Sequence, residues 1–434
     1  MKKLFLIKDT PTNKISYYHL LLFLVALPFD RFYSELVLVS LAIHTLIHFE
    51  RAHLKQLHLP TILLLTAVFL LGVLSTIYTT YRNEAFERLA RQLAILIFPL
   101  ILFVSQLDLK KYYGQILTTF TLTCVLTTGY LYIDAIRIIL YHELPLHSLF
   151  SNIFLNHNFS APIGIHATYL SMYLCLSLVH VAGSMAKSKS RKINILLIAA
   201  VFILLAGLLQ LGSRAVLLAL LALSILIPMI FFSIRRRQFF LIILSCSLFA
   251  SGLVIGLKDI RHRLVDGLQT DLGLVKTHRE IAEPRIERWK IAIEIFANAP
   301  WIGHGTGDEV PRLRKAYFDH GLYSSYISKL NAHNQYLSFA LKSGLAGLLL
   351  YLVVLITGFK KALKGKNSRF FGFMVILTFV SFSENYLDVN KGIFFYAFFF
   401  SFFTRIATRS STGQPEHPVH RFYNKTKTRL VPQA

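Results

Sequence analysis

Long apolar runs separated by short polar segments dominate the sequence. Twelve of these runs can be drawn as candidates for helices that cross the hydrocarbon layer of a membrane, which takes roughly 20 residues; the first and fourth are shorter than this and the fifth is longer. They lie at 17–29, 33–48, 60–80, 93–105, 113–140, 162–184, 193–211, 215–233, 239–257, 333–358, 370–387 and 391–407. The pattern therefore predicts an all-α polytopic membrane protein with about twelve spans.

Composition supports this interpretation and excludes several other classes of protein. Hydrophobic residues make up 54% of the chain and charged residues only 16%, whereas a soluble domain carries about 25% charged residues. The three cysteines, Cys124, Cys175 and Cys246, each lie inside an apolar run, where a thiol behaves as a small hydrophobic side chain. A soluble enzyme, a secreted disulfide scaffold and a disordered chain are excluded.

The net charge of +24 is best explained by membrane topology. In a soluble protein it would favour nucleic acid as a partner, but in a membrane protein lysine and arginine collect in cytoplasmic loops. With the N-terminus placed in the cytoplasm, all strongly basic loops fall on that side, together with the tail beyond Arg405. These loops are 50–55, 108–111, 187–192, 234–238 and 360–366. Both termini are predicted to be cytoplasmic, and no nucleic-acid partner is expected.

The topology divides the chain into four parts. Residues 1–257 are expected to form a bundle of about nine spans, and 258–332 a large, polar, helical loop on the outer side. Residues 333–407 are expected to form a second bundle of three spans. The basic tail 408–434 has few large apolar residues and is predicted to be disordered.

Arg214 is the first candidate for chemistry. It lies in a Gly-Ser-Arg turn between two apolar runs, at the outer end of the seventh and eighth predicted spans. Ionisable residues at membrane depth are costly to maintain, which makes them functional candidates. The alternative is an arginine whose charged head reaches the outer headgroups.

A second group of arginines lies in the sequence EPRIERWK of the outer loop. Arg285 and Arg288 are three residues apart and so share one face of the predicted helix. Two guanidinium groups on one face match a polyanion such as pyrophosphate, because each can bind oxygens in a bidentate manner. Pairing with Glu283 or Glu287 is the alternative.

Arg88 and Arg91 form a similar pair on the predicted outer side, between the third and fourth spans. Their spacing predicts a shared helical face that could extend an anion-binding surface. Pairing with Glu84 and Glu87 explains them equally well.

His333 lies where the outer loop enters the tenth predicted span. A neutral imidazole at this boundary could act as general base toward a hydroxyl group. The alternative is an interfacial capping residue. The sequence contains no H-E-x-x-H or G-x-S-x-G motif and no Asp-rich outer loop, so no metal site is predicted.

Taken together, these residues resemble a known family. His333-Asn334, followed after nine residues by Gly344 and after two more by Gly347, is similar to the H-[NSQ]-x9-G-x-x-[GTY] signature of bacterial O-antigen ligases. The Ser-Arg turn at Arg214, the arginine four residues before Trp289 and the P-x-x-G-x-G turn at 300–305 also resemble that family. The resemblance covers about 195–360.

This resemblance implies an integral-membrane glycosyltransferase of the GT-C-like class. Such an enzyme transfers a glycan from undecaprenyl pyrophosphate to the lipid A–core oligosaccharide, at the periplasmic face of the bacterial inner membrane, during lipopolysaccharide biosynthesis. It implies neither metal nor ATP nor any other cofactor, and inversion at the anomeric carbon. His333 would deprotonate the acceptor hydroxyl, while Arg214 and Arg285, with Arg288 sharing the task, would bind the pyrophosphate.

Three alternatives remain open from the sequence. O-antigen polymerases and protein O-oligosaccharyltransferases belong to the same superfamily and share the topology. A transporter of lipid-linked glycans would also use a basic cavity. It would, however, place cations at the midplane of spans in both halves, and it leaves the large outer loop unexplained.

Overall fold

The structure is a computed structural model that describes residues 6–51, 54, 57–231, 261, 265, 267–271 and 284–411. All regular elements within these ranges are helices. The predicted run at 239–257, the basic loop at 234–238, most of the segment 258–283 and the tail beyond residue 411 lie outside the described residues.

Eleven long helices of the described chain overlap the other predicted runs. They are α2 (Pro11–Ala26), α3 (Arg31–Ile47), α4 (Leu59–Ser75), α5 (Arg82–Val104), α6 (Tyr113–Tyr141), α8 (Ala167–Met185), α9 (Arg191–Leu211), α10 (Arg214–Phe231), α17 (Gln335–Lys364), α18 (Ser368–Val380) and α19 (Asn390–Ser411). Among them, α6, α8, α9, α10 and α17 are long and apolar enough to cross a membrane, and α4 and α18 are apolar but shorter. The part of the chain that the structure describes is thus all-helical, with several helices suited to a membrane.

Several predicted boundaries differ from the observed ones by five residues or more, and two of these differences bear on the site. Helix α5 begins at Arg82 rather than at residue 93, so its first turns carry charged residues. Helix α18 ends at Val380 rather than at residue 387. Residues 381–388 leave the helix because their polar groups bond to other elements, and they include the short 3-10 helix η6 (Tyr386–Asp388).

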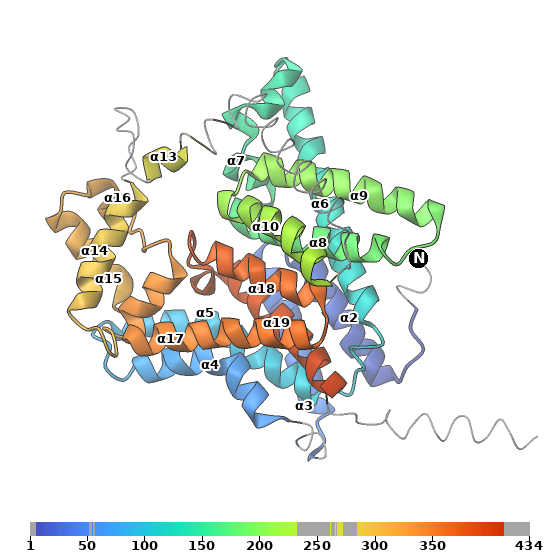
Figure 1. Cartoon of the computed structure of the whole chain (residues 1–434), viewed down its shortest axis with the longest axis horizontal. Coiled ribbons are helices and arrows are strands. Elements are labelled where there is room, and N and C mark those ends of the chain that lie inside the picture. The colour runs from blue at the N-terminus through green and yellow to red at the C-terminus, as the bar shows by residue number, and fades with distance from the viewer. Residues whose placement is uncertain are drawn as a thin grey trace, which may run out of the picture.

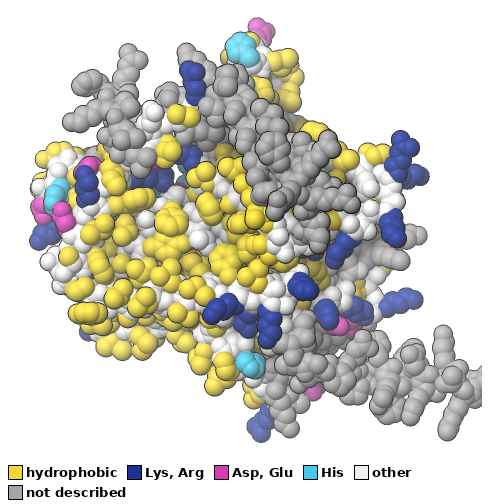
Figure 2. Space-filling model, in the orientation of Figure 1, with side chains coloured by type: hydrophobic (Ala, Val, Ile, Leu, Met, Phe, Trp, Pro, Cys, Tyr) yellow, Lys and Arg dark blue, Asp and Glu magenta, His cyan; other side chains and the backbone are white. Residues whose placement is uncertain are grey.

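Large aromatic side chains fill the core of the bundle. Helix α19 packs along α5 (Figure 1). Its phenylalanines contact aromatic residues from α2, α6 and α18. Each buried aromatic residue removes roughly 150–250 Å² from solvent and so contributes strongly to stability. Large apolar side chains also cover the outer face of the bundle, as Figure 2 shows, while Lys and Arg gather toward one edge of that view. Such a surface suits a lipid environment.

Contacts between distant loops define one end of the bundle, which we call the basic end. Tyr112, just before α6, donates a hydrogen bond of 2.7 Å to Asp9, just before α2. Arg369, at the start of α18, donates one of 3.0 Å to His180 near the end of α8. Three of the predicted inner loops, 108–111, 187–192 and 360–366, therefore lie at this end.

The other end, which we call the site end, gathers the remaining connections. The Tyr78 hydroxyl donates to the Ile302 carbonyl at 2.5 Å, and Lys391 donates to the Leu27 carbonyl at 2.9 Å. The connection between α6 and α8 also lies here and contains η2 (Leu146–Phe150), η3 (Asn152–Phe154), α7 (His157–Ser160) and η4 (Ala161–Ile163). For the eleven long helices that the structure describes, the connections alternate between the two ends as the apolar pattern predicts, and the predicted run at 239–257 lies outside the described residues.

A small helical unit covers the start of α17 at the site end (Figure 1). It consists of α14 (Arg285–Ala297), α15 (Glu309–Asp319) and α16 (Tyr323–Ile327), and the short helix α13 (Gly267–Asp271) lies nearby. Its apolar core is formed by Ile291, Ala292, Leu313, Tyr317, Ala332 and Leu341. Because Leu341 belongs to α17, this core also fixes the unit to the bundle.

Candidate functional site

His333 lies in a tight turn directly before α17. Its φ of +46° is in the left-handed region, which a residue with a side chain adopts only when its surroundings require it. The turn is held by a hydrogen bond of 2.9 Å from the His333 amide to the Asn331 side chain. Asn334 then caps α17, accepting hydrogen bonds from the amides of the second and third residues that follow it, at 3.0 and 3.2 Å. The His-Asn pair of the signature thus consists of a constrained imidazole and a helix cap.

Glu384 lies opposite the imidazole. Its Oε2 is 3.4 Å from Nδ1 of His333, and Glu384 is only 8% exposed. Burial tends to raise the pKa of the Glu384 carboxyl. The hydrogen bond with His333 and the positive charges of His333, His166 and Arg285 outweigh burial, so the pKa lies below its ordinary value. The carboxylate therefore orients the ring through Nδ1, and Nε2 has no hydrogen-bond partner among the described residues.

Arg214 and Arg285 meet on a single carboxylate oxygen. Oδ2 of Asp271 is 2.5 Å from Nη2 of Arg214 and 3.4 Å from Nε of Arg285. Each of the three side chains is about a quarter exposed, at 25–28%. The two arginines come from the first residues of α10 and α14, where the positive end of the helix dipole also favours an anion. The two guanidinium groups thus face the single carboxylate of Asp271, in a position that solvent can reach.

Arg285 also connects this anion site to the histidine. Its Nη1 donates a hydrogen bond of 3.1 Å to the carbonyl of Ser383, the residue before Glu384. On the same helix, the Trp289 indole donates one of 3.0 Å to the carbonyl of Ala332, the residue before His333. The structure therefore brings Arg214, Arg285 and His333 into one continuous region.

The other predicted arginines have different surroundings. Arg288 is buried, at 6% exposure, whereas Arg285 is partly exposed, so the two do not present equivalent guanidinium groups. Arg88 and Arg91 do not form the shared surface that their spacing predicts. Arg88 is buried against neighbouring helices and Arg91 is exposed to the surroundings, because a step of three residues rotates the helix by 60°.

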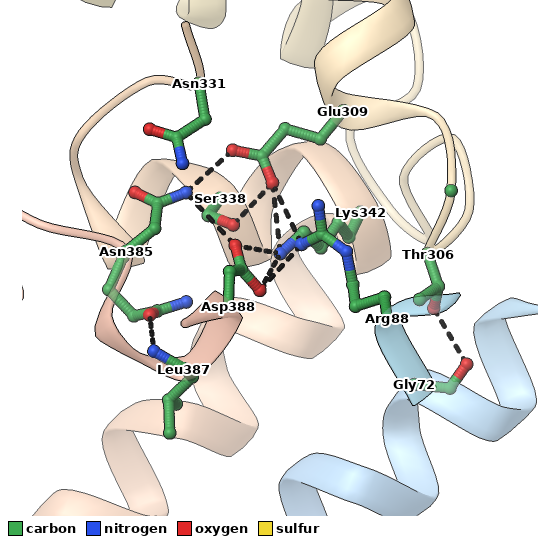
Figure 3. Close-up of polar contacts among 12 residues, drawn as sticks. Gly72, Arg88, Thr306, Glu309, Asn331, Ser338, Lys342, Asn385, Leu387 and Asp388 are labelled. Carbon is green, nitrogen blue, oxygen red and sulfur yellow. Dashed lines mark hydrogen bonds and ion pairs between the residues drawn. The ribbon is translucent and has the colours of Figure 1, made fainter. Parts of the chain in front are cut away.

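Arg88 belongs instead to a buried charge cluster, which we define as Arg88, Glu309, Lys342 and Asp388 (Figure 3). The Arg88 guanidinium is 2.7 Å from Asp388 and 3.3 Å from Glu309. The Lys342 ammonium is 2.9 Å from Asp388 and 3.0 Å from Glu309. Arg88 thus forms its ion pairs with Glu309 and Asp388 rather than with the neighbouring Glu84 and Glu87. Each of the four side chains is at most 10% exposed. When both carboxyl groups are ionised, two cations and two carboxylates balance, and the charge cluster joins α5, α15, α17 and η6 without a net charge.

Polar neighbours complete the charge cluster and connect it to the His333 turn. Ser338 donates to Glu309 at 2.7 Å, and Asn385 donates to Glu309 at 2.9 Å (Figure 3). The side-chain oxygen of the same Asn385 accepts the Asn334 amide at 2.8 Å. Burial raises the pKa of the Glu309 carboxyl to about 7, although Arg88 opposes this. The segment 384–388 therefore fixes both the imidazole and the helix cap beside it.

The signature glycines allow two backbones to touch. Gly344 interrupts α17 with φ +63°, and a Cβ there would lie 2.3 Å from the Trp301 carbonyl. A Cβ on Gly303 would lie 2.5 Å from the Gly344 amide nitrogen. The amide of Gly305 donates to the Lys342 carbonyl at 2.9 Å. Any larger residue at these positions would push the 300–305 turn away from α17.

Several members of this region were not marked by the sequence patterns. Asp271, Glu309, Glu384 and Asp388 are acidic residues separated in sequence, and no spacing relates them. One signal was available: the run SENYLD at 383–388 places two carboxylates between two apolar runs, where charged residues are costly. Within the described residues, no three His, Cys, Asp or Glu side chains are grouped so as to hold a metal ion.

Residues 199–352 match the model of the O-antigen ligase family. Over this range, about a third of its length, the chain is similar to that family. The matched range contains Arg214, Asp271, Arg285 and His333, together with Glu309 and Lys342 of the charge cluster, whereas Glu384, Arg88 and Asp388 lie outside it. Members of the family are glycosyltransferase-like ligases and polymerases that act on lipid-linked glycans. No curated protein matches the chain.

Proposed function

We propose that this protein is an O-antigen ligase, which transfers a glycan from undecaprenyl pyrophosphate to the lipid A–core oligosaccharide. The observation that carries the proposal is the meeting of Arg214 and Arg285 on one carboxylate oxygen of Asp271, in a region continuous with His333. A carboxylate oxygen is a chemical analogue of a phosphate oxygen. The geometry supports a site for an anionic group beside a base.

In this proposal the pyrophosphate of the donor replaces the Asp271 carboxylate between Arg214 and Arg285. The guanidinium groups then stabilise the negative charge that develops on the leaving pyrophosphate, in a place that the covering unit partly shields from water. Buried Arg288 adds positive potential from the same helix. Arg91, exposed on α5, would contribute only by attracting the donor, and Arg88 acts through the charge cluster.

His333 would serve the acceptor. Because Nδ1 faces Glu384, Nε2 is the nitrogen that takes the proton from the acceptor hydroxyl. The hydroxyl oxygen forms a bond to the anomeric carbon as the bond from that carbon to the pyrophosphate oxygen breaks. The ionised Glu384 stabilises the imidazolium that results, and a single displacement inverts the anomeric configuration.

The two ends of the bundle give the proposed orientation. The basic end, where α2 begins and α19 ends, would face the cytoplasm, and the site end would face the periplasm, as the positive-inside rule requires. Both termini would then be cytoplasmic. No ATP is present on that side, so the cleavage of the pyrophosphate link would drive the transfer. The proposed enzyme requires neither metal nor nucleotide and works in the inner membrane, among membrane lipids, during lipopolysaccharide biosynthesis.

A reconstituted transfer assay tests this function. It combines the purified protein with a glycan on undecaprenyl pyrophosphate and with lipid A–core acceptor, in the presence of EDTA and without ATP. Glycan should appear on the core with the parent protein, and the His333→Ala variant should lose at least roughly a hundredfold in rate. His320→Ala, which removes an exposed histidine of the same unit, should leave the rate unchanged.

The product distinguishes the possible activities. Glycan that lengthens on its carrier would make the protein a polymerase, and transfer to a protein acceptor would make it a protein ligase. Carrier that crosses the bilayer without a covalent product would identify a transporter. A requirement for a divalent cation would contradict the proposed mechanism.

A further inference from the structure

A second basic site lies at the opposite end of the bundle from His333. A cavity of about 410 Å³ opens between α6, α8 and α18, and it is lined by Tyr113, Gly114, Gln115, Thr118, His180, Ser184, Lys187 and Arg369. It lies where α6 and α18 begin and α8 ends, hence at the level where the bundle leaves the apolar layer. The residues proposed to act on glycans take no part in it.

Arg369 is held in this cavity in a defined orientation. Its Nε donates to Nδ1 of His180 at 3.0 Å, and its Nη2 approaches Ser184 at 3.5 Å. The guanidinium carbon lies 5.7 Å from the centre of the Tyr113 ring. A Cβ on Gly183 would lie 3.1 Å from Nη2, so the absence of a side chain there lets the guanidinium rest against α8.

The partners of Arg369 do not neutralise it. Because a guanidinium nitrogen can only donate, Nδ1 of His180 is the acceptor, and the ring carries its proton on Nε2, 3.2 Å from Thr118. His180 is therefore neutral. Among the described residues, no carboxylate forms an ion pair with Arg369, and the exposed Lys187 adds a second positive charge at the mouth of the cavity. A half-buried cation held by neutral groups favours an anionic ligand.

An apolar track leads away from the cavity toward the middle of the bundle. Leu122 and Leu126 follow the lining residue Thr118 at intervals of four, so all three lie on one face of α6. The two leucines are 41% and 64% exposed. An anion with an apolar tail fits this arrangement better than a free ion does.

We propose that this cavity binds the phosphate of an anionic phospholipid, whose acyl chain lies along the exposed face of α6. The guanidinium of Arg369 holds two phosphate oxygens and Lys187 neutralises the remaining charge. A zwitterionic headgroup binds less well, because Lys187 and Arg369 repel its ammonium group. The lipid joins three helices that end at this level, and so it stabilises the bundle.

Thermal unfolding of the full-length protein in detergent tests the proposal. Phosphatidylglycerol is titrated into the parent, Arg369→Gln, Arg369→Lys and Lys187→Gln. We expect a saturable rise of the midpoint temperature in the parent and an apparent affinity lower by roughly tenfold in Arg369→Gln. Arg369→Lys keeps the charge without the two-pronged geometry and should also bind more weakly. Lys187→Gln changes an exposed side chain, so it folds in any case, and should weaken binding several-fold.

The matched control is Arg191→Gln, which removes one exposed positive charge at the same end of the bundle but outside the cavity. Its affinity should equal that of the parent. Equal losses in Arg191→Gln and Arg369→Gln would show unspecific attraction to the basic end and overturn the proposal. Two further results would overturn the proposal. One is a rise of the midpoint temperature with phosphatidylcholine, carrying the same acyl chains, that equals the rise with phosphatidylglycerol. The other is an equal rise with inorganic phosphate at matched ionic strength.

Discussion

At the scale of single residues, the role of Asp271 decides between two interpretations of its contacts with Arg214 and Arg285. Its carboxylate either completes a structural ion-pair network or occupies the place of the donor phosphate. Only the second interpretation makes it a competitor of the substrate. The pair is about a quarter exposed, so solvent screens it and it contributes little to stability.

Asp271→Asn keeps the size of the side chain and removes its charge. If the pyrophosphate displaces the carboxylate, the KM for the lipid-linked donor should fall roughly fivefold while kcat stays unchanged. Asp134→Asn removes the carboxylate of another Arg–Asp pair, on α6, and provides the control in the same transfer assay. A lower kcat for Asp271→Asn would instead assign the carboxylate to the catalytic step.

Glu384 is the second residue whose role can be measured. Its lowered pKa means that the ionised form stabilises the fold above the ordinary carboxyl pKa, and that this contribution is lost as the pH falls through the lowered value. In Glu384→Gln this loss of stability on the acid side should be smaller.

The same variant should also change the activity. The imidazolium form of His333 loses the carboxylate of Glu384 that stabilises it, so the acid limb of the pH–rate profile should move to lower pH, with kcat reduced by about tenfold to a hundredfold.

The chain offers a matched control for Glu384. Glu294 lies 3.3 Å from His320, nearly the distance between Glu384 and His333. This second pair, however, lies on the exposed surface of the small helical unit. Glu294→Gln should change neither the profile nor kcat. An acid limb that does not move in Glu384→Gln would show that the carboxylate only supports the fold.

At the scale of elements, the charge cluster fixes how four segments meet. α5, α15, α17 and η6 each supply one ionised group, and each group contacts partners from at least two other elements. Removal of one charge leaves another buried without compensation, which costs about 3–5 kcal/mol. This arrangement fixes the segment 384–388, and with it Glu384 beside His333.

Lys342→Met should therefore lower the thermal midpoint by several degrees. The double variant Lys342→Met/Asp388→Asn restores the charge balance and should recover part of the loss. Lys290→Gln breaks an exposed ion pair with Glu287 and should change the midpoint by less than about a degree. A double variant that is less stable than both single variants would show that the cluster does not act through charge balance.

At the scale of the whole molecule, the alternation of ends was predictable and the convergence of the site was not. Apolar runs and basic loops predicted which connections lie together, and contacts such as Tyr112 with Asp9 agree with that prediction. The proposed glycan site and the proposed lipid site lie at opposite ends of one bundle. In these two proposals, positive charge would set the orientation at one end and bind an anion at both.

The sequence by itself predicted the long helices that the structure describes and the ends at which their connections lie, because membrane helices are set by local hydropathy and length. It also supplied the candidate arginines and histidine, whose roles stay predictions. It also indicated the family through the spacing around His333 and Gly344. Only the tertiary structure decided which residues meet: Arg214 and Arg285 on Asp271, His333 on Glu384, and Arg88 on Glu309 and Asp388 rather than on its helical neighbours. These contacts join segments up to 300 residues apart, as Arg88 and Asp388 are. Such pairing depends on the packing of whole helices, which no local pattern encodes.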